Sequence, residues 1–394
     1  MAGKGKLKVG VLGCGSIAEI AHFPSIQQSP DAELEAVCDS NEERLKEVKS
    51  KWGARVTYTD YRKMFAEAQI DAVVIATPNN LHRNQAVAAA RAGMNVIVEK
   101  PLAVTNKEAW DIVNACREHG VKLMVGCDRR FWTHNQWAKE LIEEGVIGEV
   151  LMSRASLHEH WSNYQDHVAH TGFRLDCSVA GGAAISDTGA HAIDLLTWLN
   201  GSRVKRVTGI AKRLAMPASY TLCDDTAWVL AEFENGATGC VSCNRFSPAV
   251  SQVTELYGTE GTIFTSTDAV NPYQSWPMAV FTNKDYDRDT LPKLLRDYRW
   301  PELFWVEDWI SKPVRKRWIP ICPPRSPSNY ERMCQHFLDC LLGDAEPLVS
   351  GEDGARAVEV MCAVFKSQET GAWVDLPLEE EVIPPHYKPL PPED

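Results

Sequence analysis

The sequence predicts an α/β fold in two parts, a doubly wound parallel sheet followed by an α+β region with an open, mainly antiparallel sheet. Between residues 6 and 126, short apolar runs alternate with helical patterns, which is typical of consecutive βαβ units. After residue 127, longer strand-like segments rich in β-branched and aromatic residues are joined by hairpin signals such as Glu234-Asn235-Gly236. A chain of 394 residues also exceeds the size that one hydrophobic core usually reaches.

The first part is expected to hold six parallel strands with helices between them. Each strand is a nearly continuous apolar run, as expected where helices cover both faces of a sheet. The expected strands are LKVGVLG, ELEAVCD, ARVTYT, DAVVIAT, NVIVEK and VKLMVGC. Helical patterns lie between them, over residues 17–27, 41–52, 61–68, 82–92 and 106–120.

Three segments are expected along the chain: a first domain of residues 1–127, a second of residues 128–376, and a Pro-rich tail of residues 377–394. The hairpins of the second domain leave no room for crossover helices, so its sheet should be mainly antiparallel. Its strands are expected within 148–161, 204–216, 225–243 and 251–266, and its helices over 183–199, 328–342 and 351–368.

A tryptophan-rich insertion is expected over residues 271–320. It contains Trp276, Trp300, Trp305, Trp309 and Trp318, interleaved with charges and prolines. One interpretation is that these rings pack against the body of the protein or another subunit. The other is that they form a rim over a ligand cleft.

The composition is that of a globular protein, with 44% hydrophobic and 24% charged residues. A formal charge of -12 repels phosphate backbones and anionic membranes, so neither nucleic acid nor a membrane is an expected partner. The sequence shows neither the apolar run of a secretory signal nor a stretch of about 18 apolar residues. We therefore expect a cytoplasmic protein whose twelve cysteines are reduced rather than joined in a disulfide framework.

A phosphate-binding fingerprint follows the first strand. Residues 13–18, GCGSIA, match GxGxxG/A at a helix start, where Gly13 permits a tight turn and Gly15 lets the backbone approach a pyrophosphate. Asp39 ends the second strand, where a carboxylate accepts from both ribose hydroxyls and repels a 2′-phosphate, and no arginine follows it before Arg44. These residues predict a Rossmann domain that binds NAD rather than NADP. A structural Asp39 that caps the next helix is the alternative.

Three further motifs occur in order: residues 76–79 (ATPN) with His82, residues 99–101 (EKP), and residues 187–194 (DTGAHAID). Together with GCGSIA, they make nearly the whole chain resemble the Gfo/Idh/MocA family of sugar and cyclitol oxidoreductases. The resemblance implies a Rossmann domain, a C-terminal open sheet, and tightly held NAD or NADP. It also implies that Lys100 contacts substrate and nicotinamide, and that His191 is the acid/base of an Asp-x-x-x-His pair with Asp187.

Elementary chemistry supports the same three residues. Asp187 and His191 are four apart at the start of an expected helix, so they share a face. A histidine can accept a hydroxyl proton as hydride leaves the carbon, and a partly desolvated Lys100 can polarise the developing carbonyl. Asp187 would then orient His191 or hold a second hydroxyl. The alternatives are a surface Lys100 and a buried His191 bonded to Asp187 or Asp194.

The candidate residues fall into three groups. The expected catalytic residues are Lys100, Asp187 and His191. The expected cofactor-binding residues are Gly13, Gly15, Ser16, Ile17, Asp39, Ser40, Thr77, Pro78, Asn79, His82, Glu99 and Lys100. The expected substrate-binding residues are Lys100, Arg130, His158, His160, Arg174, Asp187 and His191. Although His158 and His160 could chelate a metal from one strand face, hydride transfer needs none, so no metal is expected.

The leading hypothesis is NAD-dependent oxidation of a secondary hydroxyl on a sugar, anhydrosugar, glycoside or cyclitol. A first alternative is an NAD-recycling glycosidase that acts by oxidation and elimination. A second alternative is an inactive NAD-binding regulatory protein. Because the apolar face of an open sheet must be buried somewhere, a homodimer or homotetramer is also expected.

Overall fold

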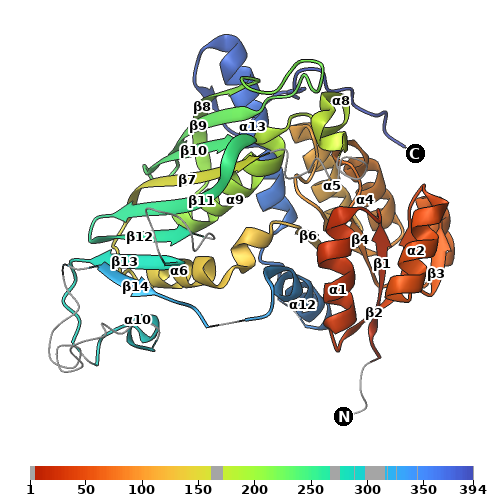
Figure 1. The fold of residues 1–394 in the computed structure, drawn as a ribbon, viewed down its shortest axis with the longest axis horizontal. Coiled ribbons are helices and arrows are strands. Elements are labelled where there is room, and N and C mark those ends of the chain that lie inside the picture. The colour runs from red at the N-terminus through yellow and green to blue at the C-terminus, as the bar shows by residue number, and fades with distance from the viewer. Residues whose placement is uncertain are drawn as a thin grey trace.

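The computed structural model describes residues 5–160, 172–266, 276–287, 289–297, 316, 318–324, 326–343 and 345–393. Two sheets organise these residues, with helices between and around them (Figure 1). The first sheet and its helices come from the N-terminal third of the chain. The second sheet comes from the remainder, which confirms the predicted fold class.

The first sheet is parallel throughout, with strand order β3-β2-β1-β4-β5-β6. Its strands are β1 (Leu7–Leu12), β2 (Ala32–Cys38), β3 (Val56–Tyr58), β4 (Ala72–Ile75), β5 (Asn95–Val98) and β6 (Leu123–Val125). The order reverses between β1 and β4. Ligands of such sheets bind at this switch point, beyond the carboxyl ends of the strands.

Helices cover both faces of this sheet. They are η1 (Ala18–His22), α1 (Phe23–Gln28), α2 (Glu42–Trp52), α3 (Tyr61–Glu67), η2 (Asn79–Leu81), α4 (His82–Arg91) and α5 (Asn106–Glu118). Local sequence sets several of their starts: Asn41 caps α2, Asp60 caps α3, and Thr105 forms a capping box with Glu108 at α5. The helix starts are therefore close to those expected from the sequence.

The second sheet has nine strands in the order β14-β13-β12-β11-β7-β10-β9-β8-β15. All neighbours are antiparallel except β7 and β10, so the sheet is mainly antiparallel, as predicted. Its strands are β7 (Val150–His160), β8 (Val204–Lys212), β9 (Thr226–Phe233), β10 (Thr238–Asn244), β11 (Phe246–Gly258), β12 (Gly261–Ser266), β13 (Met278–Thr282), β14 (Trp318–Ile321) and β15 (Val374–Asp375).

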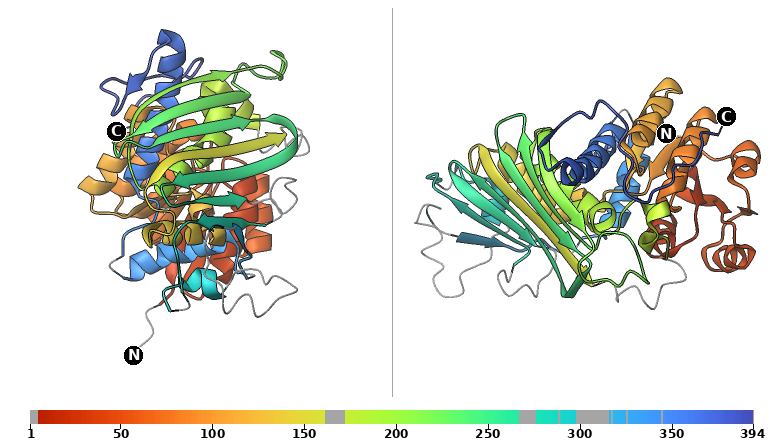
Figure 2. Two further views of the ribbon diagram at one scale, coloured as in Figure 1. Left: turned by 90° about the vertical axis from the view of Figure 1, so that its left-hand side faces the viewer. Right: turned by 90° about the horizontal axis from the view of Figure 1, so that it is seen from above.

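Helices pack between the two sheets. The remaining helices are η3 (Asp128–Phe131), α6 (Thr133–Glu143), η5 (Gly172–Leu175), α8 (Cys177–Ala180), η6 (Ala184–Gly189), α9 (Ala190–Asn200), α10 (Lys293–Asp297), α12 (Asn329–Leu342) and α13 (Gly351–Thr370). Helices α6, α9 and α13 lie against the inner face of the nine-stranded sheet, and α13 also contacts α5 (Figure 2). No described helix covers the outer face of that sheet.

Part of the tryptophan-rich insertion extends the second sheet, since it supplies β13 and β14 at one edge. Trp318 on β14 packs against Phe264 and Phe281, with ring centroids 4.9 and 5.7 Å away. Trp300, Trp305 and Trp309 lie outside the described residues. For Trp318, the structure therefore favours packing against the body of the protein.

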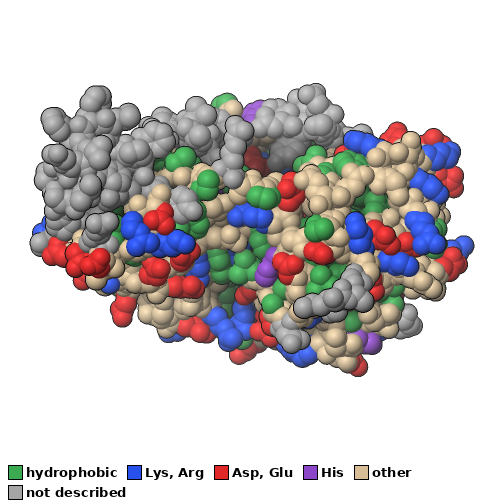
Figure 3. Space-filling view, turned by 90° about the horizontal axis from the view of Figure 1, so that it is seen from below, with side chains coloured by type: hydrophobic (Ala, Val, Ile, Leu, Met, Phe, Trp, Pro, Cys, Tyr) green, Lys and Arg blue, Asp and Glu red, His purple; other side chains and the backbone are tan. Residues whose placement is uncertain are grey.

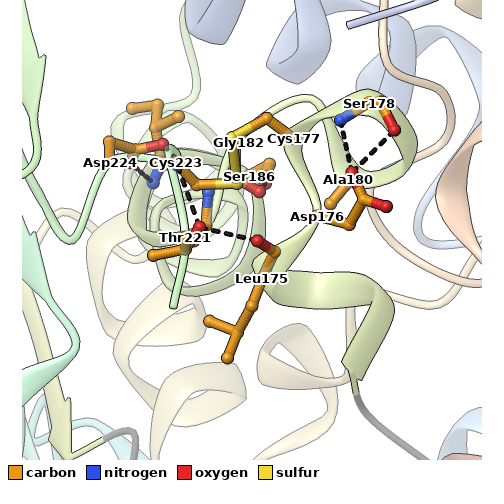
Figure 4. The surroundings of a disulfide bond; sticks show 12 residues. Leu175, Asp176, Cys177, Ser178, Ala180, Gly182, Ser186, Thr221, Cys223 and Asp224 are labelled. Atoms are coloured by element: carbon orange, nitrogen blue, oxygen red, sulfur yellow. Dashed lines mark hydrogen bonds between the residues drawn. A yellow bond between two sulfur atoms is a disulfide. The ribbon is translucent and has the colours of Figure 1, made fainter. Parts of the chain in front are cut away.

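The prediction that all cysteines are reduced is wrong for one pair. Cys177 and Cys223 form a disulfide, because α8 and the loop before β9 bring their Cα atoms to 5.3 Å (Figure 4). The other ten cysteines are free, and most of them are buried.

The Pro-rich tail packs on the first domain rather than extending into solvent. The Tyr387 hydroxyl donates to Glu108 Oε1 at 2.8 Å, and Asn106 exchanges hydrogen bonds with the backbone of Glu380 and Val382. The tail thus runs along the start of α5.

Acidic and basic side chains are interspersed over the face seen from below, without a broad basic patch (Figure 3). This distribution agrees with the negative net charge of the sequence. Among the described helices, none combines the length and apolar character needed to cross a bilayer.

Candidate active site

A groove runs along the carboxyl ends of β1, β2 and β4. Its lining includes half of the predicted cofactor-binding residues: Gly13, Gly15, Asp39, Ser40, Thr77 and Pro78. Gly13 has φ +90, and a Cβ there would lie 2.6 Å from the Ala76 carbonyl oxygen. A Cβ on Gly15 would meet no protein atom within 4 Å, so this side of the fingerprint is open to a ligand. The groove therefore fits a dinucleotide diphosphate at the start of the first helix.

Asp39 is held at the end of β2 by two backbone donors. Its Oδ2 accepts from Cys14 N–H at 2.8 Å, and its Oδ1 accepts from Asn41 N–H at 2.9 Å. Asn41, not Asp39, is the cap of α2. Asp39 therefore keeps a fixed, partly exposed carboxylate in the groove, where ribose hydroxyls can reach it.

Arg44 also lines the groove, but other groups already bind its guanidinium. Its Nη2 lies 2.5 Å from Glu19 Oε2, its Nη1 lies 3.1 Å from Glu47 Oε2, and its Nε donates to the Cys14 carbonyl at 2.7 Å. A guanidinium engaged in this way is poorly placed to bind a 2′-phosphate. This arrangement, like Asp39, favours NAD over NADP.

A second cavity adjoins the groove, since Gly15, Thr77 and Phe173 line both. The second cavity adds the predicted residues Ser16, Ile17, Asn79, Glu99, Lys100, Arg174 and Asp187. A third cavity, which shares Lys100 and Asp187 with the second, is also lined by His191. The predicted dinucleotide and catalytic residues thus border a row of adjoining cavities.

His82 does not line this space, contrary to its predicted role in cofactor binding. Its ring is fully buried, with Nδ1 3.0 Å from the Pro101 carbonyl and Nε2 2.9 Å from the Thr77 carbonyl. It therefore connects the loops that follow β4 and β5. Burial lowers the pKa of His82, which keeps the ring neutral.

Lys100 follows β5, and its peptide bond to Pro101 is cis. Its Nζ donates to the Asp187 carboxylate and, at 3.2 Å, to the Asp187 carbonyl. The neighbouring Glu99 binds a different partner, since its Oε1 lies 2.9 Å from Nε2 of the buried His22. The structure thus brings together Lys100 and Asp187, which are 87 residues apart in the sequence.

Three cations surround Asp187. Besides Lys100, the buried Arg245 donates to Oδ2, and Arg174 Nε lies 3.4 Å from the same oxygen. Burial alone would raise the pKa of Asp187, but these cations hold it well below its ordinary value. Asp187 is therefore a permanent anion at neutral pH.

His191 does not pair with Asp187, although the two are four residues apart. Asp187 lies in the π-helical turn η6, where its carboxylate is bound by Lys100 and Arg245. The carboxylate beside His191 is Asp128, with Oδ1 3.5 Å from Nδ1. Burial, Lys100 and Arg129 hold the pKa of His191 well below its ordinary value, so the ring is neutral and able to accept a proton.

Three predicted substrate-binding residues lie elsewhere. Arg130 is buried behind α9, where it pairs with Asp194 at 2.7 Å and Asp353 at 3.1 Å. On β7, Glu159 lines the cavity, so His158 and His160 lie on the opposite face of the strand. His158 Nε2 lies 3.2 Å from the Ser242 hydroxyl. The face of β7 that meets the cavity is the one that carries Glu159, and not the face that carries His158 and His160 as predicted.

A metal is not held by any set of three His, Cys, Asp or Glu side chains within the part of the chain that the structure describes. His167 and His170, which follow the His158-Glu159-His160 stretch, lie outside that part.

Several residues that line the cavity were not predicted. They are Ile20, Asp128, Arg129, Glu159, Thr188 and Tyr330. Asp128 and Arg129 follow the end of β6 after two intervening residues, and their place past the carboxyl end of a parallel strand was an available signal. No local signal marks Tyr330 on α12 or Arg245 after β10, because only the tertiary fold brings them close.

The disulfide lies beside the turn that carries Asp187. Asp224, next to Cys223, accepts from the backbone N–H groups of Ala183 at 2.9 Å and Ile185 at 2.7 Å (Figure 4). These donors belong to the start of η6 and the residue before it. The disulfide therefore fixes the loop whose carboxylate holds the first turn of η6.

The comparisons with known proteins agree with this geometry. Residues 7–127 match the model of an oxidoreductase family with an NAD-binding Rossmann fold, and residues 135–264 match the GFO/IDH/MocA C-terminal domain. The chain is 27% identical over 379 residues to myo-inositol 2-dehydrogenase of Thermotoga maritima, covering 96% of this chain and 100% of the relative. It is 32% identical over 248 residues to levoglucosan dehydrogenase of Pseudarthrobacter phenanthrenivorans, covering 58% and 63%.

A similar solved structure is the WlbA dehydrogenase of Bordetella pertussis in complex with NADH and UDP-GlcNAcA. Its TM-score is 0.73 at 25% identity, covering 95% of this chain and 100% of that one. Since both domain models match in order around a groove that fits a dinucleotide, the chain belongs to the Gfo/Idh/MocA family and is an NAD-dependent oxidoreductase.

Proposed function

We propose that this protein oxidises a secondary hydroxyl of a sugar, anhydrosugar, glycoside or cyclitol, with Lys100, Asp187 and His191 as its catalytic residues. The observation that carries this proposal is the row of adjoining cavities, with shared lining residues, that leads from Asp39 to His191. It places a neutral histidine and an ion-paired lysine next to the end of the dinucleotide groove. The curated relatives named inositol and levoglucosan dehydrogenases support the substrate class.

Bound NAD would supply the hydride acceptor, held through Gly15, Asp39 and Thr77. His191 accepts the hydroxyl proton, because burial and neighbouring cations keep its ring unprotonated. Lys100 donates a hydrogen bond to the same oxygen as it becomes a carbonyl, and so stabilises the charge that develops there. Asp187 orients Lys100 through its carboxylate and its carbonyl.

The cavity lining suits a polyhydroxylated substrate. Arg174, Arg129 and Glu159 offer donors and acceptors, while Ile20 and Tyr330 offer apolar surface. A site that combines apolar walls with several converging polar groups can fix the orientation of a ring that carries several hydroxyls.

The test is to incubate the purified protein with NAD and a panel of monosaccharides, anhydrosugars, inositols and aryl glycosides. NADH formation that disappears in Lys100→Ala and His191→Ala supports the proposal. Aglycone release without net NADH would instead identify a glycosidase that recycles its cofactor. Binding of NADH without turnover of any compound would point to a regulatory protein.

We also propose that the protein is a homodimer or homotetramer assembled through the outer face of the nine-stranded sheet. Met152, Ile210, Trp228 and Leu230 are between 39 and 50% exposed. Ile210 and Trp228 are directly paired across β8 and β9, so these side chains form part of one apolar surface. A second copy of the same face would bury it symmetrically.

We propose a cytoplasmic location because ten of the cysteines are free, and thiols are kept reduced in the cytoplasm. Cell fractionation, combined with alkylation of free thiols before lysis, tests this location. Recovery of the protein outside the cytoplasm would contradict it.

A further inference from the structure

Asp128 is a buried carboxylate that the proposed reaction has not yet used. It lies in η3, shortly after β6, with a side chain that is 3% exposed. Its Oδ1 is 3.5 Å from His191 Nδ1, and both residues line the substrate cavity. We propose that Asp128 is the positioning residue for His191, which it orients and whose protonated form it stabilises. This inference rests on the proposed function of His191 as the base.

Three side chains surround the second oxygen of Asp128. Oδ2 accepts from Asn329 Nδ2 on α12 and from Trp132 Nε1 at 3.3 Å, and Arg129 Nη1 lies 3.9 Å away. These donors hold the carboxylate in one orientation. Oδ1 is left facing the imidazole.

Asp187 cannot take this role in the observed arrangement. Lys100 binds its Oδ1, and Arg245 and Arg174 bind its Oδ2. His191 Nδ1, in contrast, is buried and makes no hydrogen bond among the described residues. The gap to Asp128 is slightly longer than a hydrogen bond, and such contacts often shorten when substrate fills a catalytic site.

The charges around His191 explain why a base here needs such a partner. Lys100, Arg129 and Arg174 oppose protonation of the ring, and burial does the same, while Asp187 favours it from a distance. Glu159 also borders the cavity. A carboxylate against Nδ1 stabilises the imidazolium at the moment it forms, without itself accepting the proton.

The proton balance follows from this geometry. With Nδ1–H directed at Asp128, Nε2 is the atom that takes the hydroxyl proton, and bound NAD would accept the hydride that leaves the carbon. The ring then carries both protons until Nε2 releases one to solvent.

Asp128→Asn tests the inference because it keeps the shape and removes the charge. We expect kcat to fall about 10- to 100-fold with an unchanged Kd for NADH, since the dinucleotide groove is not altered. Losing the negative charge lowers the pKa of the base, so the acid limb of log(kcat/KM) should move to lower pH. Asp128→Glu should restore part of the rate and return the limb toward its original position. Asp353→Asn is the matched control, because it removes a carboxylate that pairs with Arg130 away from the cavity.

A measurement independent of turnover separates this inference from the proposed function. In the NADH complex, a proton shared between His191 Nδ1 and Asp128 gives a downfield NMR resonance, assigned by its loss in His191→Gln. Its absence from Asp128→Asn supports the inference even if no substrate is turned over. An unmoved acid limb, an unchanged resonance, or an equal rate loss in Asp353→Asn would each overturn it.

Discussion

Single carboxylates in this protein take different roles according to the groups that bind their oxygens. Both carboxylate oxygens of Asp187 are bound, by Lys100 and Arg245, whereas one oxygen of Asp128 faces His191. Asp39 is held by two backbone N–H groups and faces the dinucleotide groove. The residue type alone does not distinguish these roles, because the neighbouring donors decide which atoms remain for a ligand.

Lys100→Met should lower kcat by about a hundredfold or more, because the variant loses the hydrogen-bond donor to the developing carbonyl. The protein should still bind NADH, since the phosphate-binding fingerprint is intact. Steady-state kinetics and NADH fluorescence measure the two effects. Lys107→Met, at an exposed ion pair on α5, is the control. A kcat within threefold of the unchanged enzyme would remove Lys100 from the mechanism.

Asp39→Asn should reduce the preference for NADH over NADPH by about tenfold, which is about 1.4 kcal/mol. The variant keeps the shape of the side chain but loses the charge that binds ribose hydroxyls and repels a 2′-phosphate. Titration of both reduced cofactors by fluorescence gives the ratio without any substrate. Glu43→Gln, at an exposed residue in α2, provides the comparison. An unaltered ratio would show that Asp39 does not select the cofactor.

At the scale of elements, the turn that carries Asp187 is held by other parts of the chain. The Asp224 carboxylate accepts from the start of the π-helical turn η6, and the loop that carries Asp224 is joined to α8 by the Cys177–Cys223 disulfide. On α6, His134 is buried, and the charges of Arg129 and Arg332 act on its ring. These supports are non-local, so they affect both stability and the site.

Cys177→Ser should lower the free energy of unfolding by about 2–4 kcal/mol, because the disulfide closes a loop with a sequence separation of 46 residues. Urea unfolding with and without a reducing agent measures the difference. Cys240→Ser, at a free cysteine on β10, should show no such dependence on reduction. Twelve alkylated thiols in the denatured, unreduced protein would disprove the disulfide.

His134→Phe should flatten the pH dependence of stability below about pH 6.5. Burial, with Arg129 and Arg332, lowers the pKa of His134 to about 3, from the ordinary 6.5 that the unfolded chain retains. The unfolded chain therefore binds the extra proton first, so stability is complete above pH 6.5 and declines toward pH 3. At pH 5 the loss is about 2 kcal/mol.

Thermal unfolding between pH 7.5 and 5 measures this loss in the two proteins. The same change at the exposed His119 is the control. An equal decline in Tm with and without His134 would contradict the assignment.

At the scale of the whole molecule, one side of the nine-stranded sheet is covered and the other is not (Figure 2). The inner face packs on α9 and α13, which link it to the first domain. Exposed Trp228 and Leu230 alternate with buried neighbours along β9, so they project from the outer face. The tail, in turn, returns to the first domain at α5.

Trp228→Glu should convert the oligomer into a monomer at micromolar concentration, because a charge in the centre of an apolar interface remains desolvated and unpaired. Light scattering and sedimentation measure the mass, and circular dichroism checks the fold. Lys212→Glu is the control. It changes a charge at the end of β8, which pairs with β9, but Lys212 is not one of the exposed apolar residues. An unchanged mass for Trp228→Glu, or a monomeric parent protein, would exclude this face as the interface.

The local hydrophobic pattern was sufficient to predict the strands of the first domain. Strands buried on both faces are continuous apolar runs, and the fingerprint, Lys100 and Asp187 all follow such runs or sit in recognisable motifs. Helix α6 was not predicted from the sequence. Two of its four buried residues, His134 and Asn135, are polar, so the sequence shows no regular apolar stripe there.

The sequence by itself determined the fold class and the NAD groove, and it supplied the three residues that are proposed as catalytic, since patterns and motifs within local segments carry each of these predictions. Tertiary structure decided which carboxylate faces His191, which face of β7 borders the cavity, and where Arg130 is paired. These outcomes depend on contacts between residues far apart in the chain. Periodicity shows that two faces of an element differ, but only the packed fold shows what each face meets.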